Sequence, residues 1–504
     1  MTTRWPLLPI VVTAVAIAGT VARFAADTPL WLDEALSVNI SSLPVGDIAE
    51  ALRHDGHPPL YYLLLHGWME VFGDSDIAVR AMSGVLSVLS LPVAWLVGRR
   101  RGGSTVGWLA VLVLAVSPFA LRYATETRMY SLIVLLTLLG WLALMAALDD
   151  SRPLALVGLA LTSGALLLTH YWSFWLLGSV GIVLLLRWWR SDGADRRASW
   201  RAALAVAAGG IFFLPWLPSF LEQASSTGTP WADPSRPTAI VGVTLLDFGG
   251  GRELAEATLY AVLVGVLVLL GLLGRAVDDD HVDLDLRVQP PQRGVGAVIA
   301  LTLLVGSIAG YATSSAFAAR YSSVILAPIV LLMAAGLAVL RRPVFRAAAI
   351  AVLLVLSVAG IGEVLLTDRT QAEEIAAPIN ANAAPGDVVV FCPDQLGPAG
   401  ARAITVDVDA VSYPRLEDPR FVDWVDYEER NLASDPVAFT AAVLERAGDG
   451  TIWVVASDQY RTLEGKCGAV QTELRRARPG GGLVVAENGD DVLEHAGLQR
   501  FDPS

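Results

Sequence analysis

The chain has 504 residues, of which 54% are hydrophobic and only 17% are charged, and its mean hydropathy is +0.54. These values exclude an ordinary water-soluble globular protein and indicate a membrane protein with many apolar segments. The formal net charge is −13, and its uneven distribution along the chain separates two regions.

Apolar segments occupy most of the first 366 residues. A bilayer-spanning helix needs about twenty apolar residues, and by this measure we predict about eleven spans, with an error of about one. The first span resembles a signal peptide, but no small-residue cleavage site precedes Asp33, so we expect it to be retained. The predicted spans are 6–26, 78–98, 105–121, 129–148, 154–170, 172–189, 200–217, 256–274, 294–312, 321–340 and 347–366.

Arginines collect in alternate loops, and this pattern predicts the orientation of the spans. Cytoplasmic loops of membrane proteins are rich in Arg and Lys, and the intervening loops of this chain carry fewer of them. We therefore predict a multi-pass plasma-membrane protein with a cytoplasmic N-terminus, whose odd number of spans places the tail outside. The arginines concerned are Arg4, Arg99, Arg100, Arg101, Arg152, Arg187, Arg190, Arg196, Arg197, Arg275, Arg293, Arg341 and Arg342.

The first outer loop, about residues 27–77, contains two adjacent carboxylates, Asp33 and Glu34. Such a pair at the mouth of a membrane protein is costly to desolvate unless it has a task. Consecutive side chains point in different directions, so we expect one carboxylate to face a substrate and the other to anchor a neighbouring loop. The loop also holds a predicted surface helix over 45–53 and the polar segment around His57.

Three more polar clusters recur on the same predicted outer side. Helical spacing puts Glu126 and Tyr130 on one face, with Arg128 displaced from it. Arg and Tyr at helix ends often lie at the membrane interface, but Arg128 and Arg320 gain nothing there from the positive-inside bias. A lipid-linked phosphate, which guanidinium binds bidentately, would explain both. The clusters contain Glu126, Arg128 and Tyr130; His170; and Arg320 with Tyr321.

The tail after about residue 367 differs in character from the apolar part. Between Thr367 and Ser504 lie 24 acidic and 12 basic residues, a net charge of −12. Buried-strand patterns at 387–391 and 451–455, and helical spacing near 436–446 and 467–478, predict a small α/β domain. We therefore divide the chain into a transmembrane domain, 1–366, and a water-exposed domain, 367–504, whose acidity argues against nucleic-acid binding.

Both cysteines, Cys392 and Cys467, lie in this predicted domain. In an oxidising exterior a disulfide between them is a reasonable hypothesis, and two separate buried thiols are the alternative. The acidic segment 278–283 resembles a set of metal ligands, but it lacks EF-hand spacing and is better interpreted as a solvated loop.

The motifs in this order resemble the C-type glycosyltransferase superfamily. More narrowly, they are similar to its protein-mannosyltransferase and aminoarabinose-transferase branch, glycosyltransferase family 39. The resemblance covers about residues 1–345. Lys466 is the sole lysine in an Arg-rich and Ala-rich chain, a composition typical of a high-GC bacterium such as an actinobacterium. The motifs are residues 31–35, 57–62, 126–132 and 319–321.

The resemblance implies a bundle of the superfamily's type and inverting transfer of a sugar, such as mannose or another pentose or hexose. The donor is a polyprenyl-phosphate sugar, and the acceptor belongs to the cell envelope. Asp33 is then the general base, and Arg128 and Arg320 hold the departing phosphate. For sugar or phosphate binding the resemblance implies Glu34, His57, Glu126, Tyr130, His170 and Tyr321.

The sequence departs from the family in ways that leave the acceptor open. The protein-mannosyltransferase branch often carries a large outer insertion between spans seven and eight, where this chain has only a short loop, about 218–255. A lipid, a wall polysaccharide and a protein all remain candidate acceptors. Some relatives use a divalent metal; Asp33, Glu34 and His57 would be its ligands here, but we predict neither a metal nor another cofactor.

Two other functions compete with the enzyme. A transporter or flippase of lipid-linked sugars would share the phosphate-binding arginines, although transporters more typically place polar or broken helices at mid-membrane. The other is a non-catalytic envelope assembly protein whose tail binds partners. Because the helix interiors here are apolar and the polar groups gather on one side, we favour the enzyme.

Overall fold

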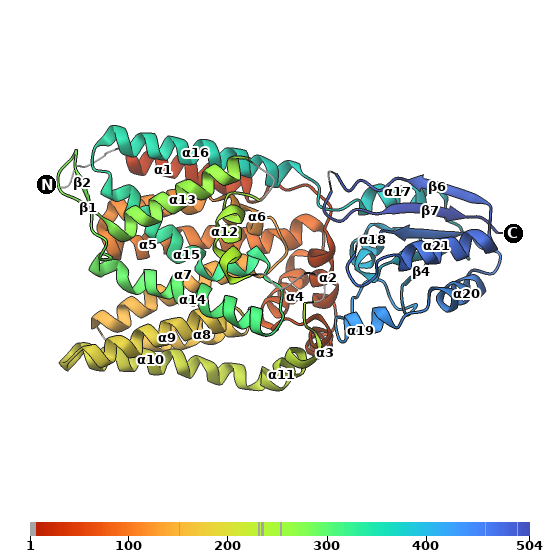
Figure 1. The fold of residues 1–504 in the computed structure, drawn as a ribbon, viewed down its shortest axis with the longest axis horizontal. Helices are drawn as coiled ribbons and strands as arrows, with labels where there is room; N and C mark the ends of the chain where they lie inside the picture. The colour runs from red at the N-terminus through yellow and green to blue at the C-terminus, as the bar shows by residue number, and fades with distance from the viewer. Residues whose placement is uncertain are drawn as a thin grey trace.

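The computed structural model describes residues 7–150, 152–229, 232, 236–251, 255–458, 460–490 and 492–503. Arg4, which contributed to the predicted orientation, lies outside the described residues. A long helical bundle and a smaller domain built on a sheet form the two parts of the molecule (Figure 1). The predicted fold class, a polytopic helical membrane protein with a C-terminal α/β domain, is confirmed.

Every predicted span falls on helix in the bundle, because these segments are long, apolar and flanked by polar or Pro-containing turns. The helices concerned are α1 (Leu8–Ala22), α5 (Asp76–Ala115), α6 (Pro118–Ala124), α7 (Tyr130–Asp150), α8 (Pro153–Leu167), α9 (Ser173–Arg190), α10 (Gly193–Phe213), η1 (Leu214–Trp216), α13 (Ala255–Leu273), α14 (Arg293–Ala312), α15 (Ser323–Val339) and α16 (Pro343–Leu366).

Within the described residues seven helices are long and apolar enough to cross a membrane, fewer than the eleven spans predicted. Part of the difference lies in α5, where two predicted spans run together across a kink at Gly102 and Gly103, the latter with φ +80°. The other missing spans are short or carry charge: α1 and α8 have 15 residues each, and α9 ends with Arg187 and Arg190.

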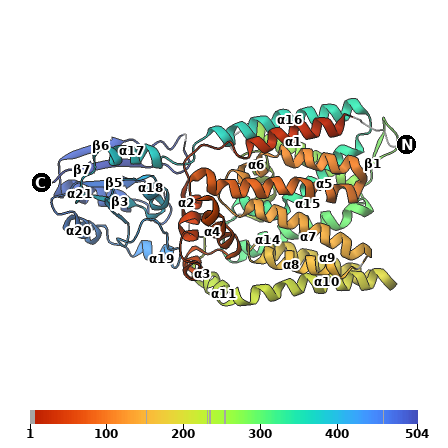
Figure 2. The same ribbon diagram turned by 180° about the vertical axis from the view of Figure 1, so that it is seen from behind.

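The segment predicted to be the first outer loop, about residues 27–77, contains α2 (Leu32–Ser41), α3 (Val45–Asp55) and α4 (Leu60–Phe72). These three helices lie between the bundle and the C-terminal domain (Figure 2). The helix predicted over 45–53 is confirmed as α3, whose Ile48 and Leu52 are fully buried; its place along a membrane surface stays a prediction. Gly56, at φ +83°, ends α3 in a left-handed conformation that favours glycine.

The segment 218–255, expected to be a short loop, contains two helices. Pro237 begins α12 at a favourable first-turn position, and the helix packs on α13. The acidic segment 278–283 lies in a two-stranded hairpin, exposed at the end of the bundle remote from the C-terminal domain (Figure 1). The elements not predicted are α11 (Leu217–Ser226), α12 (Pro237–Phe248), β1 (Gly274–Ala276), β2 (Val282–Leu284), η2 (Pro290–Gln292) and η3 (Ala319–Ser322).

The C-terminal domain is built on a five-stranded sheet with strand order β4-β3-β5-β7-β6. β3 pairs in parallel with β4 and β5, whereas β7 runs antiparallel to β5 and β6. The predicted strands and helices are confirmed as β3, β5, α20 and α21. The elements are α17 (Ala372–Asn382), β3 (Val388–Cys392), η4 (Asp394–Leu396), α18 (Gly397–Ala403), β4 (Asp409–Ser412), α19 (Tyr427–Leu432), α20 (Pro436–Ala447), β5 (Ile452–Ala456), α21 (Lys466–Ala477), β6 (Gly481–Val485) and β7 (Gly497–Phe501).

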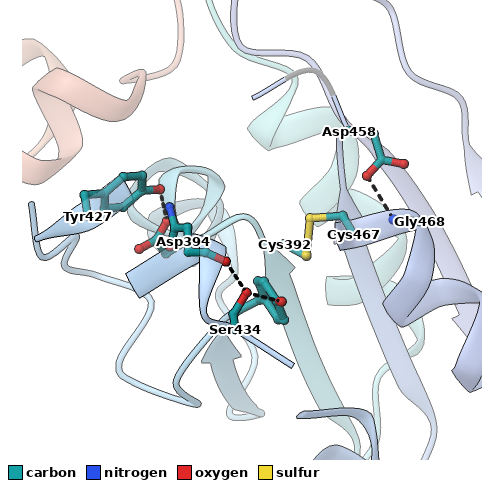
Figure 3. The surroundings of a disulfide bond; sticks show 9 residues. Cys392, Asp394, Tyr427, Ser434, Asp458, Cys467 and Gly468 are labelled. Carbon is teal, nitrogen blue, oxygen red and sulfur yellow. Dashed lines mark hydrogen bonds between the residues drawn. A yellow bond between two sulfur atoms is a disulfide. The ribbon is translucent and has the colours of Figure 1, made fainter. Parts of the chain in front are cut away.

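A disulfide joins Cys392, the last residue of β3, to Cys467 in the first turn of α21 (Figure 3). Their Cα atoms are 5.5 Å apart and both side chains are fully buried. In the same figure the Asp458 carboxylate accepts a hydrogen bond from the Gly468 N–H, at 2.9 Å. The first turn of α21 is therefore held to the sheet by a covalent bond and by a polar contact.

The C-terminal domain is tied to α2, α3, α5 and α11 by hydrogen bonds spread across its inner face. Three of them use main-chain groups, so they depend on the relative placement of the two parts rather than on long side chains alone. The ties run from Trp424 N–H to His54 O (2.9 Å), Asn39 Nδ2 to Arg420 O (2.8 Å), Asp426 N–H to Ser226 O (2.8 Å) and Arg402 Nε to Asp76 Oδ1 (2.9 Å).

Candidate active site

Three chain segments meet at the end of the bundle that the C-terminal domain covers. The first turn of α2 carries Asp33, the segment between α6 and α7 carries Arg128, and η3 carries Arg320. About 290 residues separate the first of these from the last. The fold therefore assembles one cluster from motifs that are far apart in the sequence.

Asp33 lies between two guanidinium groups. Its Oδ2 atom is 3.4 Å from Arg320 Nη2 and 3.9 Å from Arg128 Nε. That oxygen is buried and accepts no hydrogen bond from the described residues, while the side chain as a whole is 17% exposed. Two guanidinium groups thus face one carboxylate oxygen, and guanidinium groups are strong hydrogen-bond donors to anions such as carboxylate and phosphate.

Arg128 is held by hydrogen bonds on both of its terminal nitrogens. Nη1 donates to Ser37 Oγ at 2.9 Å and to the main-chain oxygen of Asp33 at 3.2 Å. Nη2 lies 3.1 Å from His57 Nε2. Since the arginine must donate, we assign the lone pair of the imidazole to Nε2 and its proton to Nδ1.

His57 is in turn oriented by Asp55, which the sequence did not single out. His57 Nδ1 is 2.9 Å from Asp55 Oδ2, and the Tyr62 hydroxyl donates to the same oxygen at 2.8 Å. Burial by itself raises the pKa of Asp55, but the nearby His57 and Arg128 and the hydrogen bonds from His57 and Tyr62 hold it below its usual value. The hydrogen bonds between Asp55 and His57 and between His57 and Arg128 thus fix the guanidinium group of Arg128 beside Asp33.

Glu34 points away from Asp33 and anchors neighbouring segments. It is fully buried, accepts from Arg80 at 2.8 and 2.6 Å, and accepts the Thr127 N–H at 2.8 Å. Since both Glu34 oxygens and both His57 nitrogens are engaged, the ligand set Asp33, Glu34 and His57 is not formed. Among the described residues no group of three or more His, Cys, Asp or Glu is arranged to hold a metal ion.

Glu126 also faces a structural partner. It is 1% exposed and pairs with Arg369, which follows α16. The expected shared helix face of Glu126 and Tyr130 is wrong, because α7 begins only at Tyr130 and residues 125–129 are not helical. The hydrogen bond from the Arg128 N–H to Glu126 O, at 2.8 Å, turns this segment sharply instead.

Aromatic rings line one side of the cluster. The ring centroid of His170 lies 5.9 Å from that of Tyr130 and 5.2 Å from that of Tyr321. The Trp172 N–H donates to His170 Nδ1 at 3.1 Å, which leaves Nε2 as the protonated nitrogen. The Tyr130 hydroxyl is buried without a partner among the described residues, so a donor group is available beside the arginines.

The structure therefore gathers Asp33, His57, Arg128, Tyr130, His170, Arg320 and Tyr321 at one place. It turns Glu34 and Glu126 toward structural partners. Asp55, Arg80 and Arg369 were missed, since no local pattern distinguishes them from other charged residues in loops and helix ends. A cavity of about 420 Å³ at the β4 edge of the C-terminal domain shares no residue with this cluster.

Comparison with known proteins shows what the chain is similar to in sequence and in fold. The family model "Dolichyl-phosphate-mannose-protein mannosyltransferase" matches residues 56–218, which include His57 and Arg128. No curated protein sequence matches the chain.

Solved structures match nearly the whole chain. ArnT from Cupriavidus metallidurans in the apo state has a TM-score of 0.65 at 13% identity, with 97% of each chain covered. The same protein bound to undecaprenyl phosphate gives 0.61 at 14% identity, again over 97% of each. The Archaeoglobus fulgidus oligosaccharyltransferase with Zn and sulfate gives 0.53 at 12% identity, covering 94% of this chain and 72% of that one.

The chain has the fold of the C-type glycosyltransferases. The resemblance to the protein-mannosyltransferase and aminoarabinose-transferase branch is confirmed, by the family model over residues 56–218 and by fold over almost the full length. At these identities the structural matches establish the fold, and the chemistry has to be argued from the residues described above.

Proposed function

We propose that this protein is a membrane glycosyltransferase that moves a sugar from a polyprenyl-phosphate carrier to a cell-envelope acceptor. The observation that carries the proposal is the position of Asp33 between the guanidinium groups of Arg320 and Arg128. A base and an anion-binding pair are the two things that this reaction needs from a protein. The relative crystallised with undecaprenyl phosphate supports a lipid phosphate as the anion.

In the proposed reaction the carboxylate of Asp33 removes the proton of the acceptor hydroxyl. The acceptor oxygen attacks the anomeric carbon, and the bond from that carbon to the phosphate oxygen breaks in the same displacement. The leaving phosphate carries away the bonding electrons, and the anomeric configuration is inverted. A phosphate is already a good leaving group, so the site needs positive charge rather than a general acid.

Arg128 and Arg320 are proposed to hold that phosphate. Guanidinium groups offer two parallel N–H donors to a phosphate, in a geometry that matches its oxygens. Asp55 and His57 keep Arg128 in place. Tyr130, His170 and Tyr321, on the other side, are proposed to contact the phosphate or the sugar hydroxyls.

The site is proposed to face the outside of the plasma membrane, with a cytoplasmic N-terminus. The hairpin β1–β2, which begins with Gly274 and Arg275, lies at the opposite end of the bundle from the C-terminal domain (Figure 1). Because arginines favour the cytoplasmic side, this arrangement supports an outward-facing site beneath an extracytoplasmic domain. We also propose the division into a membrane domain, 1–366, and a C-terminal domain, 367–504.

The test is a transfer assay with purified protein. A panel of radiolabelled polyprenyl-phosphate sugars is incubated with envelope lipid, polysaccharide and protein fractions, and the labelled product is identified with its anomeric configuration. The proposal predicts a product with inverted configuration from at least one donor. Retained configuration would contradict the single displacement, and movement of intact donor across vesicles without transfer would favour a flippase.

A further inference from the structure

The first turn of α2 is capped by the far end of the chain. Trp31, at the N-cap position, makes no side-chain cap, although the first N–H groups of a helix need acceptors. The Leu32 N–H instead donates to Glu494 Oε2 at 2.8 Å, across 462 positions of sequence. Leu32 and Glu494 are both buried, at 9% and 5% exposure. Asp33 is the next residue along the helix.

Glu494 is itself held rigidly by the segment that follows α16. Its N–H donates to Arg369 O at 2.8 Å, and its own main-chain oxygen accepts the Gln371 N–H at 3.1 Å. The side chain of Arg369 pairs with Glu126, two residues before Arg128. Glu494 thus connects the C-terminal domain to α2, which carries Asp33. Arg369 connects it to the segment before α7, which carries Arg128.

Docking alone does not explain the placement of Glu494. The C-terminal domain has other hydrogen bonds to the helices below it, including those from Arg402 to Asp76 at the start of α5. Asp33 and Glu34 repel the Glu494 carboxylate, and burial together with that repulsion raises the pKa of Glu494 to about 8. A costly buried carboxyl at this point indicates a specific requirement at the start of α2.

We propose that Glu494 is a positioning residue for Asp33, so that the C-terminal domain completes the active site of the membrane bundle. Its carboxyl oxygen fixes the first turn of α2 by accepting the Leu32 N–H, and this sets where Asp33 stands relative to Arg320 and Arg128. The inference rests on the proposed function, in which Asp33 acts as the base.

The test compares E494A, E494Q and E494D with the control R402A in the full-length protein. E494A removes the acceptor, and E494D shortens its reach by one methylene. E494Q keeps an oxygen that can accept the Leu32 N–H, whereas R402A removes a domain tie that is not attached to α2. The measurements are kcat and donor KM in the transfer assay, and hydrogen exchange of the amides in the first turn of α2.

We expect kcat to fall about tenfold to a hundredfold in E494A, since a small displacement of a reacting group has an effect of this size. The donor KM should change less than about twofold, because Arg128 and Arg320 remain. Exchange at the start of α2 should speed up in E494A and in E494D. E494Q and R402A should keep both the wild-type kcat and slow exchange. If E494A does not fold, E494D carries the comparison.

Equal kcat in E494A (or E494D) and R402A, with equal exchange at α2, would overturn the positioning role. So would a loss in E494Q as large as that in E494A, because the negative charge and not the accepted hydrogen bond would then matter. If the wild-type protein transfers no sugar from any donor, the proposed function fails. Exchange at α2 then decides by itself whether Glu494 holds this helix: unchanged exchange overturns the inference.

Discussion

Asp33 and Glu34 are neighbours in the chain, yet their carboxylates meet different partners. Asp33 faces Arg320 and Arg128 at the partly exposed end of the bundle, while Glu34 is buried against Arg80 and the Thr127 N–H. The difference follows from the turn of roughly 100° between successive helical residues. One carboxylate is thus accessible to a reacting molecule, and the other fixes the segment that presents Arg128.

Arg320 offers the clearest test of phosphate binding at the residue scale. The variant R320K keeps the charge but loses the planar fork that matches a phosphate. We expect donor KM to rise about tenfold or more, with a smaller effect on kcat, because a charge-assisted hydrogen bond contributes about 1.5–3 kcal/mol. Steady-state kinetics with a water-dispersible donor analogue measures this change in donor KM. The matched control is R476K, which alters an exposed arginine of α21. Equal donor KM in the two variants would exclude a phosphate contact by Arg320.

At the scale of elements, the site depends on where helices begin. α2 starts just before Asp33, α7 starts just after Arg128, and η3 carries Arg320 directly before α15. Of the three groups, Arg128 is held in place by its hydrogen bonds to Ser37, Asp33 O and His57. The buried pair of Glu34 and Arg80 joins α2 to α5, and Glu34 also holds the segment before α7 by accepting the Thr127 N–H.

Removing that pair tests whether it holds the elements. The variant E34Q leaves the buried guanidinium of Arg80 beside a neutral amide, and breaking a buried pair costs about 3–5 kcal/mol. The hydrogen bond from Arg80 to Pro29 O remains, so we expect a loss near the lower figure. Thermal unfolding of the purified protein in detergent should show a clear fall in Tm. The control E50Q removes an exposed pair with Arg53, which is worth at most about 1 kcal/mol. An equal Tm for E34Q and E50Q would contradict this role.

The outcome shows which features a sequence reveals. The helical spans, α3, β3, β5, α20 and α21 were predictable because burial repeats with the period of a helix or follows a short apolar run. Asp33, Arg128 and Arg320 stood out because charge beside apolar helices is unusual. Arg369 and Glu494 could not be found in this way, since their contacts with Glu126 and with the Leu32 N–H span 243 and 462 positions of sequence. α12 was missed because it is a short helix inside a segment interpreted as a loop.

At the scale of the whole molecule, two buried carboxyls of the C-terminal domain make stability depend on pH. Burial raises the pKa of Glu494 to about 8 and that of Asp394 to about 7. Both folded-state pKa values lie above those of the unfolded chain. At a pH between the unfolded-state and the folded-state pKa, the folded protein therefore binds more protons than the unfolded chain. The stabilisation is therefore fully present below the unfolded pKa values of 4.5 and 3.8 and is lost as the pH rises through 7 to 8.

We therefore expect the Tm of the detergent-purified protein to fall between about pH 5 and about pH 8. In E494Q the fall should be smaller, because the amide does not ionise, and the remainder should come from Asp394. A control variant, E473Q, alters a partly exposed carboxyl on α21 that is paired within its own helix, and it should keep the wild-type pH dependence. A Tm that rises with pH, or an identical fall in E494Q and wild type, would contradict the assignment.

The most direct measurement of the central claim is the single-turnover rate of sugar transfer by D33N at saturating donor. The change preserves size and removes the base, so we predict a fall of about 10²-fold to 10⁴-fold with donor affinity retained. The matched control is D47N, an exposed carboxyl in the first turn of α3, which should transfer at the wild-type rate. Transfer by D33N as fast as by D47N would show that Asp33 is not the base.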